Sequence, residues 1–180
     1  MRRFALSAVA VVAAVGLLSG CGGSDDAEGG ESAASSPGSA APAAERKADG
    51  ALTAGSAFER LAAEVGAAEL TGTVTAENDP NKLLGRPGQY TSKVTFRDSR
   101  VAATEVEGVD KGDVSRGGAV EAFDSAADAK ARADYIESVT KGMPALTEYR
   151  YLSGPVLVRV SRHLTPDKAA EYEAAVKKLD

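Results

Sequence analysis

The stretch Gly117–Ser161 reads GGAVEAFDSAADAKARADYIESVTKGMPALTEYRYLSGPVLVRVS and decides the fold class. Its first segment, Ala119–Phe123, would have apolar residues on both faces of a strand, which is typical of a central strand. Ser125, with Asp128 three residues later, predicts the N-terminus of a helix. Helical spacing then predicts a buried stripe made of Ala129, Ala133, Ile136, Val139 and Met143.

Two further strands and a helix are predicted after this helix. Tyr149–Leu152 and Val156–Ser161 flank the turn sequence Ser-Gly-Pro, so they are expected to form a hairpin. Thr165 followed by Pro166 is typical of a helix start. The buried stripe predicted for this last helix is Ala169, Tyr172, Val176 and Leu179.

The elements on the N-terminal side of this stretch are less regular. Tyr90–Arg97 alternates with period two and predicts a strand, and Val101–Val106 is a possible partner strand. Ser56 with Glu59 resembles a capping box before an amphipathic helix, and a weak extended segment follows at residues 70–76. Because strands and helices interleave without βαβ regularity, we expect an α+β fold. Its sheet should be small and mainly antiparallel, with two to three helices packed on one face.

The first residues, MRRFALSAVAVVAAVGLLSGCGG (Met1–Gly23), have the layout of a secretory signal peptide: a basic head, an apolar run and small residues. The apolar run is near 15 residues, whereas a membrane-spanning helix needs about 20. Leu18-Ser19-Gly20-Cys21 resembles a lipobox, the recognition site of bacterial lipoproteins. The resemblance implies cleavage before Cys21 and lipidation of its thiol, so that the chain is held on the extracytoplasmic face of the cell membrane.

The residues after Cys21 predict a linker. Gly, Ser, Ala, Pro and acidic residues dominate up to about Leu52, and such a composition cannot bury enough apolar surface to order itself. At about 5–6 Å × √n, some thirty residues would reach on the order of 30 Å. The expected organisation is a signal peptide at 1–20, a flexible tether at 21–52 and one domain at 53–180.

Charge and composition exclude several functions. The formal net charge is −5, and loss of Arg2 and Arg3 with a signal peptide would make it −7. An acidic domain lacks the basic surface that nucleic acid requires, so no nucleic-acid partner is expected. With Cys21 acylated no thiol remains, which excludes thiol catalysis, and a single histidine with carboxylates argues against a zinc site. We expect no cofactor and no metal.

Catalytic candidates are few. His163 is the one histidine, and no nucleophile motif accompanies it. Asp110 and Asp113, near Glu105 and Glu107, lack the ligand spacing of a calcium loop. An alternative reading is a cell-wall-acting hydrolase that uses carboxylates from separate strands, with Asp98, Asp110, Asp113 and Glu121 as the possible acids.

The segment Asn78–Tyr90, NDPNKLLGRPGQY, is the densest local signal in the chain. Its Asn, Asp, Pro and Gly residues predict consecutive turns, and loops on a rigid sheet often carry recognition. The alternative is a structural loop pinned to the core by Leu83 and Leu84. If the loop binds a partner, the candidate residues are Asn78, Asp79, Lys82, Arg86, Gln89 and Tyr90.

Three longer stretches, NDPNKLLGRPGQYTSKVTFRD, GGAVEAFDSAADAKARADYI and YRYLSGPVLVRVSRHLTP, resemble small lipoproteins and secreted proteins of Gram-positive bacteria. That group has no assigned activity, so the resemblance implies a location and a shared domain. We expect a non-enzymatic, membrane-anchored module that binds an envelope protein or a cell-wall component. The hydrolase remains an alternative, as does a small solute-binding lipoprotein, although some 130 folded residues cannot form two lobes.

Overall fold

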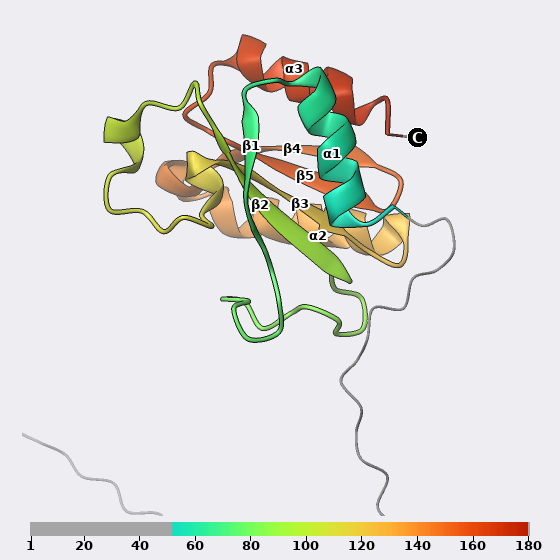
Figure 1. The fold of residues 1–180 in the computed structure, drawn as a ribbon. Helices are drawn as coiled ribbons and strands as arrows, with labels where there is room; N and C mark the ends of the chain where they lie inside the picture. Colours follow the sequence, from blue (N-terminus) through green and yellow to red (C-terminus); the bar gives the residue numbers. More distant parts are fainter. Residues whose placement is uncertain (1–51, 180) are drawn as a thin grey trace, which may run out of the picture. The chain divides into compact units, whose positions relative to one another are not determined.

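The computed structural model describes residues 52–179 and is drawn in Figure 1. The predicted signal peptide, Cys21 and nearly all of the predicted tether lie outside the described residues. The helices are α1 (Ala54–Glu64), α2 (Ala126–Thr140) and α3 (Pro166–Val176); the strands are β1 (Ala68–Thr73), β2 (Ser92–Asp98), β3 (Gly117–Ala122), β4 (Glu148–Ser153) and β5 (Val156–Ser161); and the 3₁₀ turns are η1 (Ala103–Val106), η2 (Val114–Arg116) and η3 (Pro144–Leu146).

The five strands form one sheet in the order β1-β2-β3-β5-β4, and every neighbouring pair is antiparallel. The expected α+β class, with an antiparallel sheet and three helices packed against it, is confirmed. β4 and β5 form the predicted hairpin around Gly154, which has a φ of +48°. α2 begins at the predicted cap, where the Ser125 hydroxyl accepts a hydrogen bond from the Asp128 N–H.

The helices cover both faces of the sheet, whereas the sequence pattern placed them on one (Figure 1). α1 and α3 enclose the larger core, in which the Phe96 ring lies between Phe58 and Tyr172 at centroid distances of 5.5 and 5.6 Å. α2 packs on the opposite face through Ala129, Ala133 and Ile136. The sheet has apolar side chains on both faces at its centre, and a single layer of helices could not cover them.

The central strand β3 is buried at all six residues, as its sequence predicts. It begins with Gly117-Gly118, where the neighbouring strands approach too closely for a side chain. A Cβ on Gly118 would lie 2.2 Å from the Arg159 carbonyl oxygen and 2.3 Å from the Phe96 ring. The glycine pair therefore has a packing role.

Three details differ from the sequence-based expectations. Residues 101–106 form no strand: β1 and β3 already occupy both sides of β2, and the segment ends in η1. The cap of α1 is Thr53, which exchanges hydrogen bonds with Ser56, so the helix begins before the expected Ser56. Of the stripe predicted for α2, Val139 is exposed because it borders a hollow instead of the core, and Met143 is exposed because α2 ends at Thr140, before it.

Candidate functional site

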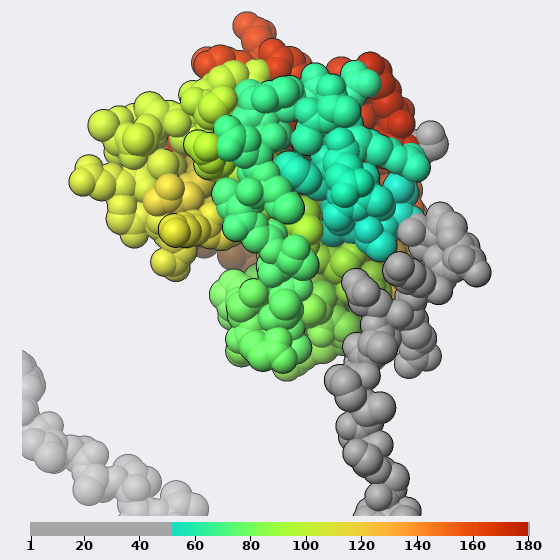
Figure 2. Space-filling model, in the orientation of Figure 1, coloured from blue at the N-terminus to red at the C-terminus, as the bar shows by residue number. Residues whose placement is uncertain are grey.

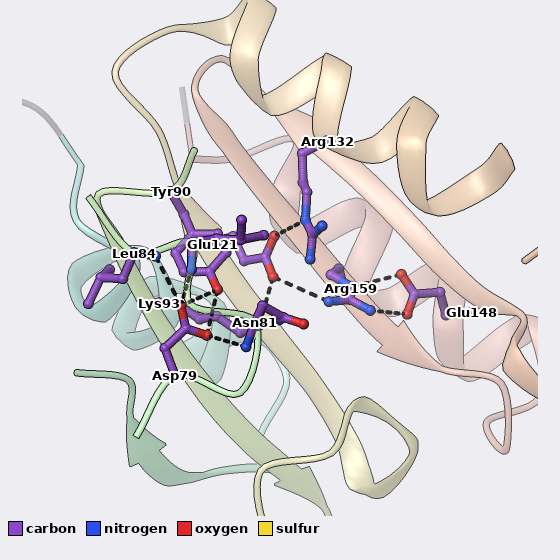
Figure 3. A network of polar contacts seen from close by, with 10 residues as sticks. Asp79, Asn81, Leu84, Tyr90, Lys93, Glu121, Arg132, Glu148 and Arg159 are labelled. Atoms are coloured by element: carbon purple, nitrogen blue, oxygen red, sulfur yellow. Dashed lines mark hydrogen bonds and ion pairs between the residues drawn. The ribbon is translucent and has the colours of Figure 1, made fainter. Parts of the chain in front are cut away.

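Glu121 lies at the centre of the α2 face of the sheet and has no exposed surface. Three cations contact its carboxylate: Lys93 Nζ is 2.9 Å and Arg159 Nη1 3.2 Å from Oε1, and Arg132 Nε is 3.3 Å from Oε2. Figure 3 shows Arg132 reaching down from α2 toward this carboxylate, while Arg159 approaches along the sheet. A buried carboxylate of this kind requires partners, because burying it unpaired is very costly.

Strand register explains how these side chains meet. Lys93 is the direct cross-strand neighbour of Glu121, whereas Arg159 on β5 pairs with Ala119, two residues before Glu121 and on the same face of the sheet. Arg159 also forms a two-pronged ion pair with Glu148 of β4, at 2.8 and 2.7 Å. We call these five residues, Lys93, Glu121, Arg132, Glu148 and Arg159, the buried charge cluster. It holds three cations against two anions.

The electrostatic balance keeps Glu121 ionised. Burial alone would raise the pKa of this carboxyl, but the charges of Lys93, Arg159 and Arg132 outweigh burial and hold the pKa below its usual value. A general acid needs the opposite shift, which keeps its proton at neutral pH. Glu121 is therefore a fixed negative charge at the centre of the cluster.

A hollow of about 300 Å³ opens beside the cluster, between the C-terminal half of α2 and the β4–β5 edge. Its lining combines the charged side chains of Arg132, Arg159 and Glu148 with exposed apolar side chains. Tyr135, Val139 and Leu146 are 60%, 43% and 55% exposed. We call this space the α2 hollow; it also contacts Asn81, Asp113, Val114, Ser115, Ile136, Thr140, Ala145, Thr147, Ser161 and Arg162.

Two polar groups of the α2 hollow have spare hydrogen-bonding capacity. Arg132 has a side chain that is only 9% exposed, and its one ion pair is made through Nε. Its two terminal nitrogens have no polar partner within residues 52–179. The Ser115 hydroxyl is likewise buried without a hydrogen-bond partner in the described part of the chain. The Ser115 hydroxyl is enclosed, whereas the terminal nitrogens of Arg132 are not, so Arg132 marks the place where a ligand can bind.

The loop of residues 74–91 is held in place by Asp79. This carboxylate is buried, accepts hydrogen bonds from the backbone N–H groups of Asn81, Leu83 and Leu84 at 2.8–3.0 Å, and accepts another from the Tyr90 hydroxyl at 2.7 Å. Burial would raise the pKa of Asp79, but these hydrogen bonds lower it from 3.8 to about 2. Asp79 is therefore ionised at neutral pH and anchors the loop.

Lys93 connects the hydrogen-bonded pair of Asp79 and Tyr90 with the buried charge cluster. Its ammonium group contacts Glu121 and also lies 5.1 Å from the centre of the Tyr90 ring. Burial, and then the hydrogen bond to Asp79, raise the pKa of Tyr90, so its hydroxyl remains a donor. Figure 3 shows the two polar groups side by side.

The six predicted loop residues divide into two groups. Asp79 and Tyr90 are buried and bond to each other, and Asn78 closes a turn by accepting from the Thr75 N–H at 2.7 Å. These residues build the loop. Lys82 and Arg86 are exposed and Gln89 is half-buried, so a binding role for them stays a prediction. Leu83 and Leu84 pack against the smaller core, as the structural alternative expected.

A second hollow, of about 420 Å³, lies on the part of the sheet that α2 leaves uncovered. Figure 2 shows the loop of residues 74–91 and the segment 99–116 as separate lobes with a recess between them. Thr71, Thr95, Asn78 and Lys93 contribute to its lining, as do Asp110 and Asp113. Within residues 52–179, no group of three or more His, Cys, Asp or Glu side chains is placed to hold a metal ion.

The remaining catalytic candidates have structural partners. Asp98 bonds to Arg100 and to the Tyr172 hydroxyl at 2.7 Å; burial would raise its pKa, but these contacts lower it. His163 lies 3.1 Å from Glu105 through Nδ1. Asp110 and Asp113 belong to the second hollow, while Asp98 and Glu121 are enclosed in separate polar groups. These carboxylates form no acid–base pair.

The sequence analysis missed Lys93, Arg132, Arg159 and Glu148 as site residues. One signal could have found them: Glu121 is a charged residue in a strand with apolar residues on both faces. A carboxylate at the centre of a sheet predicts cations on the adjacent strands and on the helix above. Their identity depends on the strand order, which the sequence does not reveal.

Comparison of this chain with protein-family models, with curated proteins and with solved structures finds no match. As for membrane insertion, none of the helices within residues 52–179 combines the length and the apolar character needed to cross a bilayer.

Proposed function

We propose that this chain is a membrane-anchored, extracytoplasmic binding protein without catalytic activity, and that its ligand, a component of the cell envelope, occupies the α2 hollow. The observation that carries the proposal is Arg132. Its guanidinium group is nearly enclosed, yet its two terminal nitrogens have no polar partner among the described residues. Ligand sites combine an apolar lining with a few such polar groups, and their usual volumes start near 300 Å³.

The location rests on the sequence. The resemblance of Leu18–Cys21 to a lipobox supports a lipid on Cys21, and the composition of residues 22–52 supports a tether long enough to hold the domain clear of the bilayer. Two or more acyl chains give stable attachment, whereas one gives only marginal binding.

A binding protein fits the carboxyl groups better than a hydrolase does. Hydrolases that use two carboxyls raise the pKa of one of them, which then serves as the acid. Each resolved pKa shift of a carboxyl group in residues 52–179 is downward: those of Glu77, Asp79, Asp98 and Glu121. Nothing in this part of the chain favours the hydrolase.

Removal of the lipidated residue tests the location. In cells that express the full chain, the Cys21→Ala variant is expected to leave the membrane fraction, because no acyl chain remains to hold it there. Cell fractionation and mass spectrometry of the N-terminal peptide measure the effect. Recovery of unacylated wild-type chain, or of Cys21→Ala in the membrane at the wild-type level, would contradict the anchor.

Filling the α2 hollow tests the binding site. Ala145 lines the hollow and is exposed, so Ala145→Trp is expected to block it without disturbing either core. Equilibrium dialysis of the full-length chain in detergent against an envelope extract, followed by mass spectrometry, should show a component retained by the wild type and lost at least ten-fold in Ala145→Trp. Ala102→Trp, an exposed alanine outside the hollow, is the control. Equal retention by all three proteins would contradict the site.

A further inference from the structure

We propose that the α2 hollow recognises a carboxylate that carries a short apolar group, either a free organic acid or the C-terminal residue of a peptide. This inference rests on the proposed function and specifies its ligand class. It follows from three properties of the hollow: the geometry of Arg132, the local charge and the position of the apolar side chains.

The geometry of Arg132 matches a carboxylate. A guanidinium group is planar and presents its N–H donors as a fixed fork, which pairs with the two oxygens of a carboxylate. In Arg132 the Nε donor is directed to Glu121, which leaves the edge formed by the two terminal nitrogens. Figure 3 shows the Nε contact with Glu121 and no further contact of the group among the residues drawn. Ser115 also lines the hollow, but its hydroxyl is enclosed, so the recognition of a carboxylate rests on Arg132.

The charge around the hollow matches a monovalent anion. Its lining contains the cations Arg132, Arg159 and Arg162 and the anions Glu148 and Asp113, a surplus of one positive charge. Behind these residues, the positive charge of Lys93 and the negative charge of Glu121 cancel each other. A carboxylate would balance this surplus, whereas a doubly charged phosphate would exceed it. The whole chain is acidic, with a formal charge of −5, so the positive character is local to this site.

The apolar side chains of the hollow suit a short apolar group. Tyr135, Val139 and Leu146 are exposed and belong to the same lining, and the Arg132 guanidinium lies 5.8 Å from the centre of the Tyr135 ring. Covering them with an apolar ligand removes water from their surfaces, which is favourable in proportion to the area covered. A volume of about 300 Å³ accommodates one amino-acid-sized group and not a long acyl chain.

Isothermal titration of the full-length chain in detergent tests the ligand class. N-acetyl-L-leucine is the probe; N-acetyl-L-leucinamide lacks the carboxylate, acetate lacks the apolar group, and inorganic phosphate is the other anion. We expect the acid to bind at least ten-fold more tightly than each of the other three, because only the acid offers both a carboxylate for Arg132 and an apolar group for the apolar side chains. A pentapeptide ending in leucine, with a free or an amidated C-terminus, distinguishes a peptide end from a free acid.

Matched variants connect the binding to the named residues. Arg132→Gln and Arg132→Lys are expected to weaken binding of the acid at least ten-fold, since neither retains the two-pronged edge; Lys130→Gln on the exposed side of the same helix should not. Leu146→Ala should weaken binding a few-fold, and Leu70→Ala, at a matching exposure of 54%, should not. Glu121 keeps two cations without Arg132, and thermal melting checks that the variants are folded.

The outcomes separate this inference from the proposed function. If the acid and the amide bind alike, or Arg132→Lys binds like the wild type, the carboxylate assignment is wrong. If Ala145→Trp still abolishes retention of an envelope component in that case, the hollow remains the ligand site and only the ligand class fails. If neither the probes nor any envelope component binds in the hollow, both are wrong.

Discussion

Replacing Glu121 by alanine is expected to lower the free energy of unfolding by about 3–5 kcal/mol, the usual cost of removing one partner of a buried ion pair. The change leaves Lys93 and Arg132 without their anion and removes one of the two anions that contact Arg159. All three cations are largely buried, so water cannot replace the lost carboxylate fully. Urea denaturation of wild type and variant under identical conditions measures the difference.

The chain contains a matched control for this experiment. Glu69 and Arg97 form a cross-strand ion pair between β1 and β2, but both side chains are about half exposed. Glu69→Ala should therefore cost no more than about 1 kcal/mol. If Glu121→Ala costs as little as Glu69→Ala, the cluster does not stabilise the fold and its assignment as a fixed ionised centre is wrong.

The pH dependence gives a second measurement on the same variant. Because the pKa of Glu121 is lower in the folded chain than in the unfolded chain, its contribution to stability is complete above the unfolded value of about 4.3. That contribution disappears as the pH falls through the folded value. The difference in stability between wild type and Glu121→Ala should thus be largest at neutral pH and shrink below about pH 4.

Local patterns in the sequence are sufficient to predict which side chains are buried where one whole face of an element packs against the core. The predicted stripe Ala169, Tyr172, Val176 and Leu179 is buried in full: the first three residues lie on the inner face of α3, and Leu179 packs into the same core just after the helix ends. The same reasoning was wrong for Val139 and Met143. Their spacing continues the stripe of α2, but Val139 faces the hollow and its charged side chains, and the helix ends at Thr140, before Met143.

The candidate site needed information that periodicity does not contain. Lys93, Glu121, Arg132, Glu148 and Arg159 come from four strands and one helix, and they meet only because β5 inserts between β3 and β4. The order of strands is a property of the tertiary fold. Period-two alternation identified the two faces of β2 and β5, yet it could not tell that the polar face is also buried.

The loop illustrates the opposite case. Its turn residues were recognisable, and Lys82, Gly85 and Gly88 have positive φ angles of 55°, 73° and 70°. The sequence predicts Asp79 and Tyr90 as binding residues, because loops on a rigid sheet often carry recognition. Their burial follows from a contact between residues eleven positions apart, which composition alone does not predict.

Asp79→Asn is expected to destabilise the fold by about 2–4 kcal/mol, although it changes almost no volume. Oδ1 accepts from Asn81 and Oδ2 accepts from Leu83 and Leu84, so either orientation of an asparagine sets its NH₂ group against a backbone N–H. Each buried donor left without an acceptor costs about 1–3 kcal/mol. Chemical denaturation gives the total loss, and hydrogen exchange at the amides of Leu83 and Leu84 should accelerate.

Measuring stability as a function of pH shows whether the stability lost in Asp79→Asn comes from the ionised carboxylate. The pKa of Asp79 is about 2 in the folded chain and 3.8 ordinarily, a difference equivalent to about 2 kcal/mol of stability. Since the folded value is the lower one, this contribution is present above pH 4 and is lost as the pH falls toward 2. The stability of Asp79→Asn should consequently depend less on pH than that of the wild type over this interval.

Two control variants distinguish the effect of the Asp79 carboxylate from the effects of its tyrosine partner and of an exposed carboxyl. Tyr90→Phe removes one hydrogen bond and keeps the three backbone contacts of Asp79, so we expect a loss of about 1 kcal/mol and a retained acid transition. Asp110→Asn changes an exposed carboxyl and should have little effect. If Asp79→Asn is no worse than Asp110→Asn, the loop is not held by Asp79. Its exposed cations, Lys82 and Arg86, would then belong to a segment free to move, and the wall that Asn81 adds to the α2 hollow would move with them.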